Sequence, residues 1–131
     1  MIREYLENVT ERLSISPAIK TFQVLRYRVT DEEGHLRIKC NLLNNDIVEM
    51  NKYPQIEKGK IEVKNYSFHW QKETVKLVKR WDNVEHHPEI DTFPHHLHVE
   101  VDQNVHPCEP MNFDKIIKIL ESTVIPADLI E

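Results

Sequence analysis

Apolar residues recur at helical spacing near both ends of the chain. The first stripe consists of Ile2, Leu6, Val9 and Leu13. The second stripe consists of Phe113, Ile116, Ile117 and Leu120. Positions three or four residues apart share one face of an α-helix, so the pattern predicts an amphipathic helix over residues 2–13 and another after residue 112. Asn112 is of a residue type that caps helix N-termini.

Between these helices, the pattern changes to the alternation of apolar and polar residues that is typical of half-buried β-strands. The alternation is clearest over residues 36–42, and other stretches are rich in β-branched and aromatic residues. We expect strands at residues 21–29, 36–42, 47–50, 61–71, 75–81 and 95–101. Residues 53–59 include a proline and a glycine and are expected to form a connection, and residues 107–110 a loop bounded by two prolines.

This order of elements predicts an α+β fold, in which an antiparallel, curved sheet of five to six strands is flanked by an N-terminal and a C-terminal helix. The length of 131 residues is typical of one domain, so we expect residues 1–131 to fold together. The two cysteines form no motif, and no stretch of sequence is long and apolar enough to span a membrane. We therefore expect a cytoplasmic protein without a membrane segment.

Charge is distributed unevenly along the chain, whose net charge is −5. Residues 1–80 carry 15 Lys and Arg against 11 Asp and Glu, whereas residues 81–131 carry 2 against 11. The basic first part could attract phosphate groups. The alternative, that the two oppositely charged parts attract each other, stays open.

Histidines are concentrated in one stretch, residues 81–99. It contains five of the eight in the chain: His86, His87, His95, His96 and His98. An imidazole has an ordinary pKa of about 6.5, so it can both accept and release a proton near neutral pH. This density of titratable rings around two prolines indicates a functional site.

Metal-independent cleavage of RNA is one reaction for such a site. It requires a base for the 2′-hydroxyl proton, an acid for the leaving oxygen and a cation for the charged phosphorane. His69 or the histidines of residues 86–98 could supply base and acid. Arg80 could supply the cation, and Asp82 could orient it or a histidine. The candidates for substrate binding, by base stacking or polar contact, are Tyr66, Trp70, Trp81 and Asn83. Core packing of the aromatic residues and a structural Arg80–Asp82 salt bridge are the alternatives.

Metal binding is a second use of the same residues. The imidazoles available are those of His86, His87, His96 and His98. Three of them converging on one ion would form an open zinc site. However, the cysteines are not placed as zinc ligands, and hydrogen bonds to loop carbonyls would also account for some of these histidines. We therefore expect no metal and no cofactor, and we keep a metal-dependent nuclease as an alternative.

Five spaced motifs follow one another in the second half of the chain. They are Tyr66-Ser-Phe-His69-Trp-Gln71, Arg80-Trp-Asp-Asn83, His86-His87-Pro88-Glu89, Thr92-Phe-Pro-His-His96 and Val105-x-Pro107. In this order they resemble the TumE-type toxin family of prokaryotic toxin–antitoxin loci, over roughly residues 21–122. The loop at residues 83–85 departs from the family pattern, in which a residue smaller than Val84 is expected.

The resemblance implies a cytoplasmic toxin whose partner is an antitoxin with a helix-turn-helix. The positions that match the family are His69, Arg80, Asp82, Asn83, His86, His87, Pro88, His95 and His96. Cleavage of RNA follows only by analogy with the usual activity of such toxins. We therefore expect a metal-independent ribonuclease toxin that acts on RNA. A non-enzymatic toxin that binds a target stays open, as does a homodimer.

Overall fold

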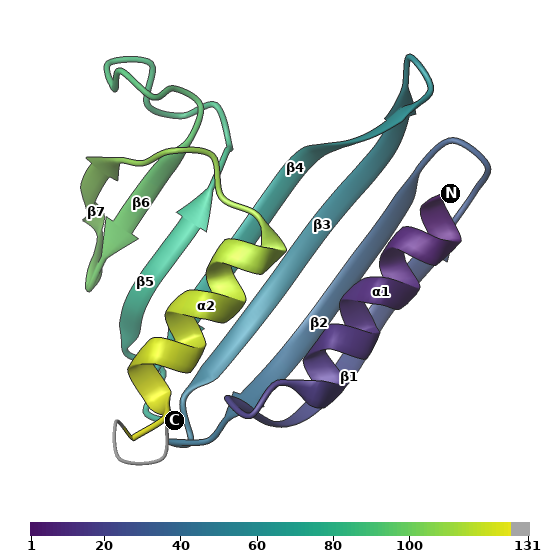
Figure 1. Cartoon of the computed structure of the whole chain (residues 1–131). Coiled ribbons are helices and arrows are strands. Elements are labelled where there is room, and N and C mark those ends of the chain that lie inside the picture. The colour runs from purple at the N-terminus through teal and green to yellow at the C-terminus, as the bar shows by residue number, and fades with distance from the viewer. Residues whose placement is uncertain (127–131) are drawn as a thin grey trace.

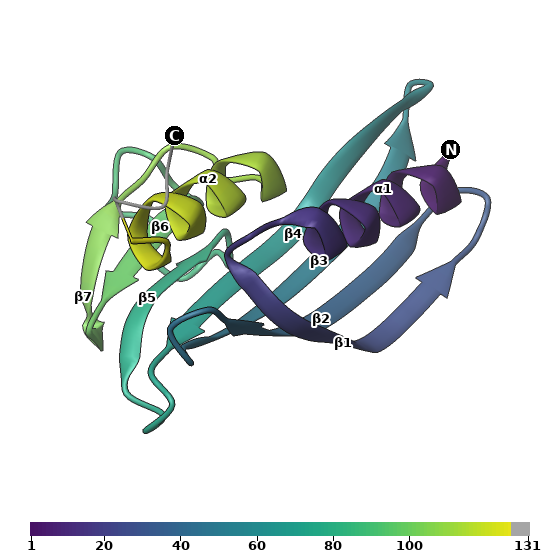
Figure 2. The ribbon, with the colours of Figure 1, turned by 60° about the horizontal axis from the view of Figure 1, so that its bottom comes forward.

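The computed structural model describes residues 1–126 and consists of two layers, a sheet and a pair of helices on one of its faces (Figure 1). The helices are α1 (Ile2–Ile15) and α2 (Phe113–Val124). The strands are β1 (Ile19–Val29), β2 (Gly34–Leu42), β3 (Ile47–Glu57), β4 (Lys60–Gln71), β5 (Leu77–Asp82), β6 (His96–Val99) and β7 (Val101–Pro107). The sheet twists along its length, as Figure 2 shows from a second direction.

The sheet is an open antiparallel meander, in which each strand pairs with the next one in the sequence. The α+β prediction is therefore confirmed, with seven strands in place of five to six. None of the helices within residues 1–126 combines the length and the apolar character that crossing a membrane requires.

The third strand was predicted to end at residue 50 and to be followed by a connection at residues 53–59, which is wrong. β3 continues through Pro54 to Glu57, and the hairpin turns at Lys58 and Gly59, whose φ angles are 51° and 77°. Two consecutive residues with positive φ are what a tight two-residue hairpin requires. The register shifts between Tyr53 and Pro54, and such an irregularity lets a strand contain a proline, which has no N–H to donate.

The last predicted strand, residues 95–101, is in fact two strands. The chain reverses at Glu100, which has a φ of 64°, and β7 returns along β6 through residues 102–106, for which we had predicted no strand. A residue with positive φ also explains the later start of β5, because Val75 has a φ of 73° and lies in the preceding turn. Neither residue is of a type that signals this conformation.

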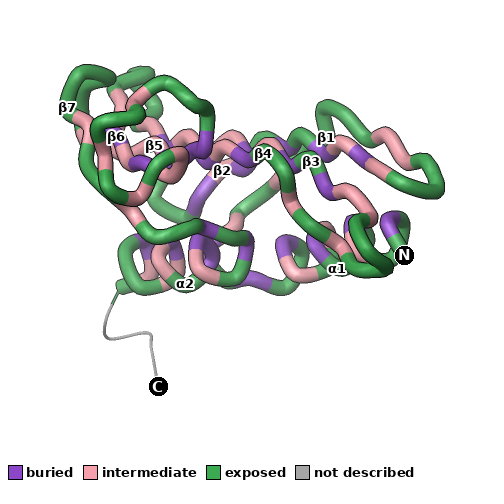
Figure 3. The backbone as a smooth tube through the Cα atoms, turned by 90° about the horizontal axis from the view of Figure 1, so that it is seen from above, coloured by how far each residue is buried: buried purple, intermediate pink, exposed green. Residues whose placement is uncertain are grey.

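The core lies between the helices and one face of the sheet, and Figure 3 shows both helices on the same side. Both predicted helical stripes are buried there, and the Asn112 side chain accepts a hydrogen bond from the N–H of Lys115, as a cap does. The central strand β4 contributes Tyr66, Phe68 and Trp70 to this core. Alternate residues of the same strands therefore point to the opposite face, which the helices leave uncovered. We call it the open face.

Lys52 is a charged residue that is buried on the helix side of the sheet. Lys52 is 3% exposed, and its Nζ lies 4.8 Å from the centre of the Tyr5 ring and 5.3 Å from that of Phe113. The aromatic faces attract the ammonium group. Burial nevertheless disfavours the charged form and lowers the pKa of Lys52 to about 8.

We expect the stability of the protein to depend on pH through Lys52. An unfolded lysine keeps its proton up to about pH 10.4, whereas the folded protein releases it near pH 8, so the unfolded state binds more protons between these values. The free energy of unfolding, measured relative to Lys52→Met, should therefore rise from pH 8 to pH 10.5, by up to about 3 kcal/mol. Urea unfolding of both proteins at pH 7, 9 and 10.5 measures this difference.

Comparison with Lys52→Met removes contributions that both proteins share. Burial raises the pKa values of Tyr5 and Cys40 to about 12, and these groups titrate in either protein. A difference that stays constant from pH 7 to pH 10.5 would contradict the lowered pKa of Lys52.

Candidate functional site

Strand pairing brings together polar residues that are far apart in the sequence. His69 of β4 lies opposite Arg80 of β5, which lies opposite His98 of β6. Two pairs further along, Asp82 of β5 lies opposite His96 of β6. Residues paired in this way point to the same face of a sheet, here the open face. The site is therefore built on three adjacent strands.

Asp82 is at the centre of this arrangement and is only 3% exposed. Its Oδ2 accepts a hydrogen bond of 2.9 Å from Nε of Arg80, and its Oδ1 accepts one of 3.1 Å from the backbone N–H of Val84. Oδ1 also lies 2.9 Å from Nε2 of His96, and Oδ2 lies 3.7 Å from Nε2 of His98. The buried carboxylate thus has the charged and polar partners that burial requires.

His96 and His98 are held in one orientation by backbone carbonyl groups. Nδ1 of His96 lies 2.9 Å from the oxygen of Pro94, and Nδ1 of His98 lies 2.7 Å from the oxygen of Asp102. A carbonyl oxygen only accepts hydrogen bonds, so both Nδ1 atoms carry a proton. The Nε2 side of each ring consequently faces Asp82 and the interior of the site.

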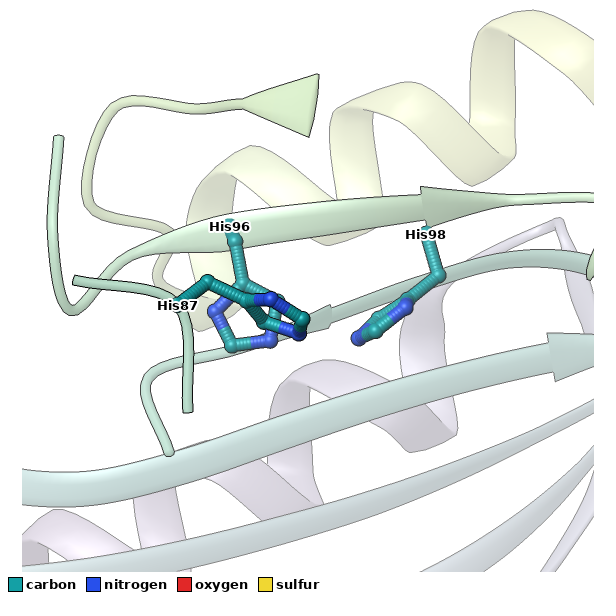
Figure 4. A group of neighbouring side chains, drawn as sticks. All are labelled: His87, His96 and His98. Carbon is teal, nitrogen blue, oxygen red and sulfur yellow. The ribbon is translucent and has the colours of Figure 1, made fainter. Parts of the chain in front are cut away.

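A third histidine joins them from the loop between β5 and β6. The ring centre of His87 lies 5.1 Å from that of His96 and 6.0 Å from that of His98, and the latter two are 4.8 Å apart. One ligand nitrogen from each ring lies within 4.8 Å of the others. Figure 4 shows the three rings converging. We call His87, His96 and His98 the histidine triad.

Arg80 links the Asp82 carboxylate to His69 on the other side of the site. Its Nη1 lies 3.2 Å from Nδ1 of His69, and a guanidinium can only donate, so His69 accepts through Nδ1. Burial and, next, the positive charge of Arg80 lower the pKa of His69 below its ordinary value. His69 is therefore a neutral imidazole at neutral pH.

Two further histidines of the sequence prediction lie outside this arrangement. His86 is exposed beside the triad, and only its backbone N–H makes a hydrogen bond in the described part of the chain, to the oxygen of Val84. Nδ1 of His95 lies 2.8 Å from the hydroxyl oxygen of Tyr66. Burial, with the nearby His96 second, lowers the pKa of His95. His95 thus connects the site to the core.

The four predicted substrate-binding residues are buried, although Tyr66 and Asn83 also contribute to the lining of a cavity on the open face. The aromatic rings of Tyr66, Trp70 and Trp81 are part of the hydrophobic core. The side chain of Asn83 makes hydrogen bonds of 3.0 Å with the backbone N–H of Tyr66 and 2.8 Å with the carbonyl oxygen of Lys64, which fasten the loop to β4. These positions favour core packing and loop anchoring for the four residues.

An aromatic pair that the sequence analysis missed lies on the open face instead. The rings of His35 and Tyr53 are stacked, with centres 4.0 Å apart and an interplanar angle of 12°. They line a cavity of about 450 Å³ together with Arg37 and Arg80. Arg80 and His69 also line an adjoining hollow of about 320 Å³. The predicted strand at residues 36–42 began one residue after His35, and Tyr53 was assigned to a connection, so the sequence analysis did not bring the two together.

The arrangement has three chemical capacities. Arg80 offers a guanidinium that can bind an anion, and the neutral His69 beside it can accept a proton. The histidine triad offers imidazole nitrogens that can hold either protons or a metal ion. Arg80 and His69 line hollows on the open face that a ligand can reach, whereas His96 and His98 are buried next to them.

Comparisons with known proteins identify the family of the chain. Neither the comparison with curated proteins nor the comparison with solved structures found a match. A family model described as Toxin TumE matches residues 6–124, which include all seven strands, α2 and most of α1. The resemblance in the motifs around the histidines is thereby confirmed, and the chain belongs to the TumE toxin family.

Proposed function

We propose that this member of the TumE toxin family acts in the cytoplasm by cleaving RNA at the site around Asp82. Membership of a toxin family implies an antitoxin partner. We further propose that this antitoxin contains a helix-turn-helix and is encoded next to the toxin, as in a type II toxin–antitoxin system. A fold or family does not specify a reaction, so the chemistry is argued from the site.

The observation that supports RNA cleavage is the unbroken series of contacts from His69 through Arg80 and Asp82 to His96. In this series, a neutral imidazole, a guanidinium and further imidazoles lie next to one another along the open side of the sheet. Cleavage of a phosphodiester by its own 2′-hydroxyl requires a base, a cation and a proton donor. Asp82 contributes by holding Arg80 and His96 rather than by reacting itself.

The reaction starts when the phosphate binds the Arg80 guanidinium, whose side chain is 32% exposed. A guanidinium drawn toward the phosphate releases Nδ1 of His69, which then accepts the proton of the 2′-hydroxyl. The 2′-oxygen forms a bond to phosphorus as the bond to the 5′-oxygen breaks, and that oxygen takes up a proton. The products are a 2′,3′-cyclic phosphate and a 5′-hydroxyl.

The histidine triad faces the phosphate from the side opposite His69. In the metal-independent form expected from the sequence, a protonated imidazole of the triad protonates the leaving oxygen. His87 suits this role best, because it is less buried than His96 and His98. A metal-dependent form of the same cleavage is a second candidate, favoured by the convergence of the three ligand nitrogens.

The stacked rings of His35 and Tyr53 provide a surface for an RNA base. Bases of single-stranded RNA stack on aromatic side chains with little regard to sequence. The pair shares its cavity with Arg80, so a base on Tyr53 would place a neighbouring phosphate near the guanidinium. This surface takes the role that the sequence analysis gave to three aromatic residues of the core.

We expect His69→Ala and His87→Ala to lose RNA cleavage and toxicity while remaining folded, because the first removes the proposed base and the second the proposed proton donor, and neither side chain is fully buried. Loss of a proton-transfer group typically costs a factor of about 100 or more in rate. The measurements are growth arrest on expression and the appearance of 2′,3′-cyclic phosphate ends, with circular dichroism to check folding. His106→Ala is the matched control, because His106 is exposed on β7. Full toxicity in both variants would reject the proposal.

The rate of RNA cleavage should depend on pH as a bell-shaped curve. Protonation of His69 abolishes its action as a base, and its lowered pKa puts the acidic limb below about pH 6.5. Deprotonation of the group that protonates the leaving oxygen produces the alkaline limb. Cleavage rates measured from pH 5 to pH 9 at constant ionic strength test this, and a flat profile would argue against histidine chemistry.

Tyr53→Ala should weaken binding of single-stranded RNA while the rate of the bound complex changes little. Loss of one stacking contact costs about 1–3 kcal/mol, or roughly 5-fold to 150-fold in KM. Tyr27→Ala provides the control, since Tyr27 is similarly exposed but lies on β1, outside the cavity. Equal KM values in the two variants would remove Tyr53 from the RNA-binding surface.

A further inference from the structure

We propose that the histidine triad binds one divalent transition-metal ion, and that Zn²⁺ is the ion that its ligands favour. Binding can be measured without RNA, whereas the use of the ion in catalysis rests on the proposed ribonuclease function. The proposal replaces the expectation from the sequence that no metal is required. Its basis is the orientation, spacing and charge of the triad.

The first basis is that all three rings are oriented through the same nitrogen. Nδ1 faces an oxygen acceptor in each case: the Pro94 carbonyl for His96, the Asp102 carbonyl for His98 and, at 3.3 Å, the Glu89 carboxylate for His87. Histidines that bind metals characteristically use their second nitrogen in this way, because the hydrogen bond fixes the tautomer and the direction of the ring. Each Nε2 is left as the available ligand.

The second basis is distance. The three ligand nitrogens lie within 4.8 Å of one another, whereas nitrogens bound tetrahedrally to one Zn²⁺ are about 3.3 Å apart. His96 and His98 are fixed on the same face of β6, but His87 is carried by the loop between β5 and β6. A shift of the His87 ring by about 1.5 Å toward the other two would close the site around an ion.

The third basis is the unusual position of His96 between two acceptors. Its Nδ1 faces the Pro94 carbonyl and its Nε2 lies 2.9 Å from Oδ1 of Asp82. A neutral imidazole has only one N–H, so it can satisfy only one of these oxygens. The other contact leaves a buried negative charge next to this ring, and that charge favours a cation bound at the triad.

The ligand set also decides which ion is expected. Three imidazoles suit Zn²⁺ and its neighbours in the transition series, whereas Mg²⁺ and Ca²⁺ prefer oxygen ligands. Three protein ligands leave the fourth position of a tetrahedral zinc site for water or a phosphate oxygen. Under the proposed function, the ion would add its charge to that of Arg80 at the phosphate that is cleaved.

The test is a calorimetric titration of the untagged, chelator-treated full chain with Zn²⁺. We expect one ion per chain, at least 10-fold weaker binding in His87→Ala, and unchanged binding in His106→Ala. His87 is suited to this test because it is partly exposed in a loop, so its replacement should leave the fold intact, as circular dichroism can verify. Co²⁺ in place of Zn²⁺ should give the visible absorption of a tetrahedral site, and Mg²⁺ should not bind there.

The outcomes separate the metal site from the proposed function. No binding of Zn²⁺, or equal binding by His87→Ala and His106→Ala, would overturn the metal site. Full RNA cleavage by chelator-treated protein that takes up no metal would also overturn it and would leave the ribonuclease proposal standing. Binding of Zn²⁺ that depends on His87, without any cleavage of RNA, would instead support the metal site and reject the ribonuclease.

Discussion

The burial of the Asp82 carboxylate is the constraint on which the site depends. A charge that is almost completely withdrawn from water must find compensating charges and hydrogen bonds nearby. Asp82 obtains them from Arg80, from the backbone N–H of Val84 and from His96, and His98 lies next to it. The same contacts therefore fix the guanidinium, the start of the loop after β5 and two histidines of β6 in one arrangement.

The two faces of the sheet differ in what they carry: one packs against the helices to form the core, and the other carries the candidate site. Alternate residues of β4 and β5 point either into the helix-covered core or onto the open face, so the aromatic core and the polar site are built from the same strands. β5 is paired on both sides, with β4 and with β6, which gives Arg80 and Asp82 a rigid base. The loop between β5 and β6 brings the His87 ring next to the His96 ring of β6.

Much of the fold follows from the sequence, because periodicity reports directly which side of an element is buried. The helical stripes and the alternation of β2 predicted their elements well. Errors occurred where one residue decides the path of the chain. Pro54 suggested a break, although the strand accommodates it with a register shift. Glu100 reverses the chain with a positive φ that its residue type does not signal.

The candidate site was predictable in composition but not in connectivity. The density of histidines located it, and alternation placed Arg80 and Asp82 on one face. That His69 contacts Arg80, and that His96 contacts Asp82, depends on the register between strands, which pattern alone does not fix. The stacking surface was missed for the same reason, since Tyr53 meets His35 only because β3 extends beyond Met50 alongside β2.

The cost of this site argues that it is functional rather than structural. Asp82, His96 and His98 are buried in a small domain, and well-packed apolar residues in their place would often give equal or greater stability. A sheet that needed only stability could have had apolar residues at these positions of β5 and β6. The chain instead buries a carboxylate and two imidazoles and uses backbone carbonyls to aim both rings at one point. The protein therefore gives up some stability to hold these two rings in one orientation, and a fixed orientation helps them to bind a proton, a metal ion or a substrate.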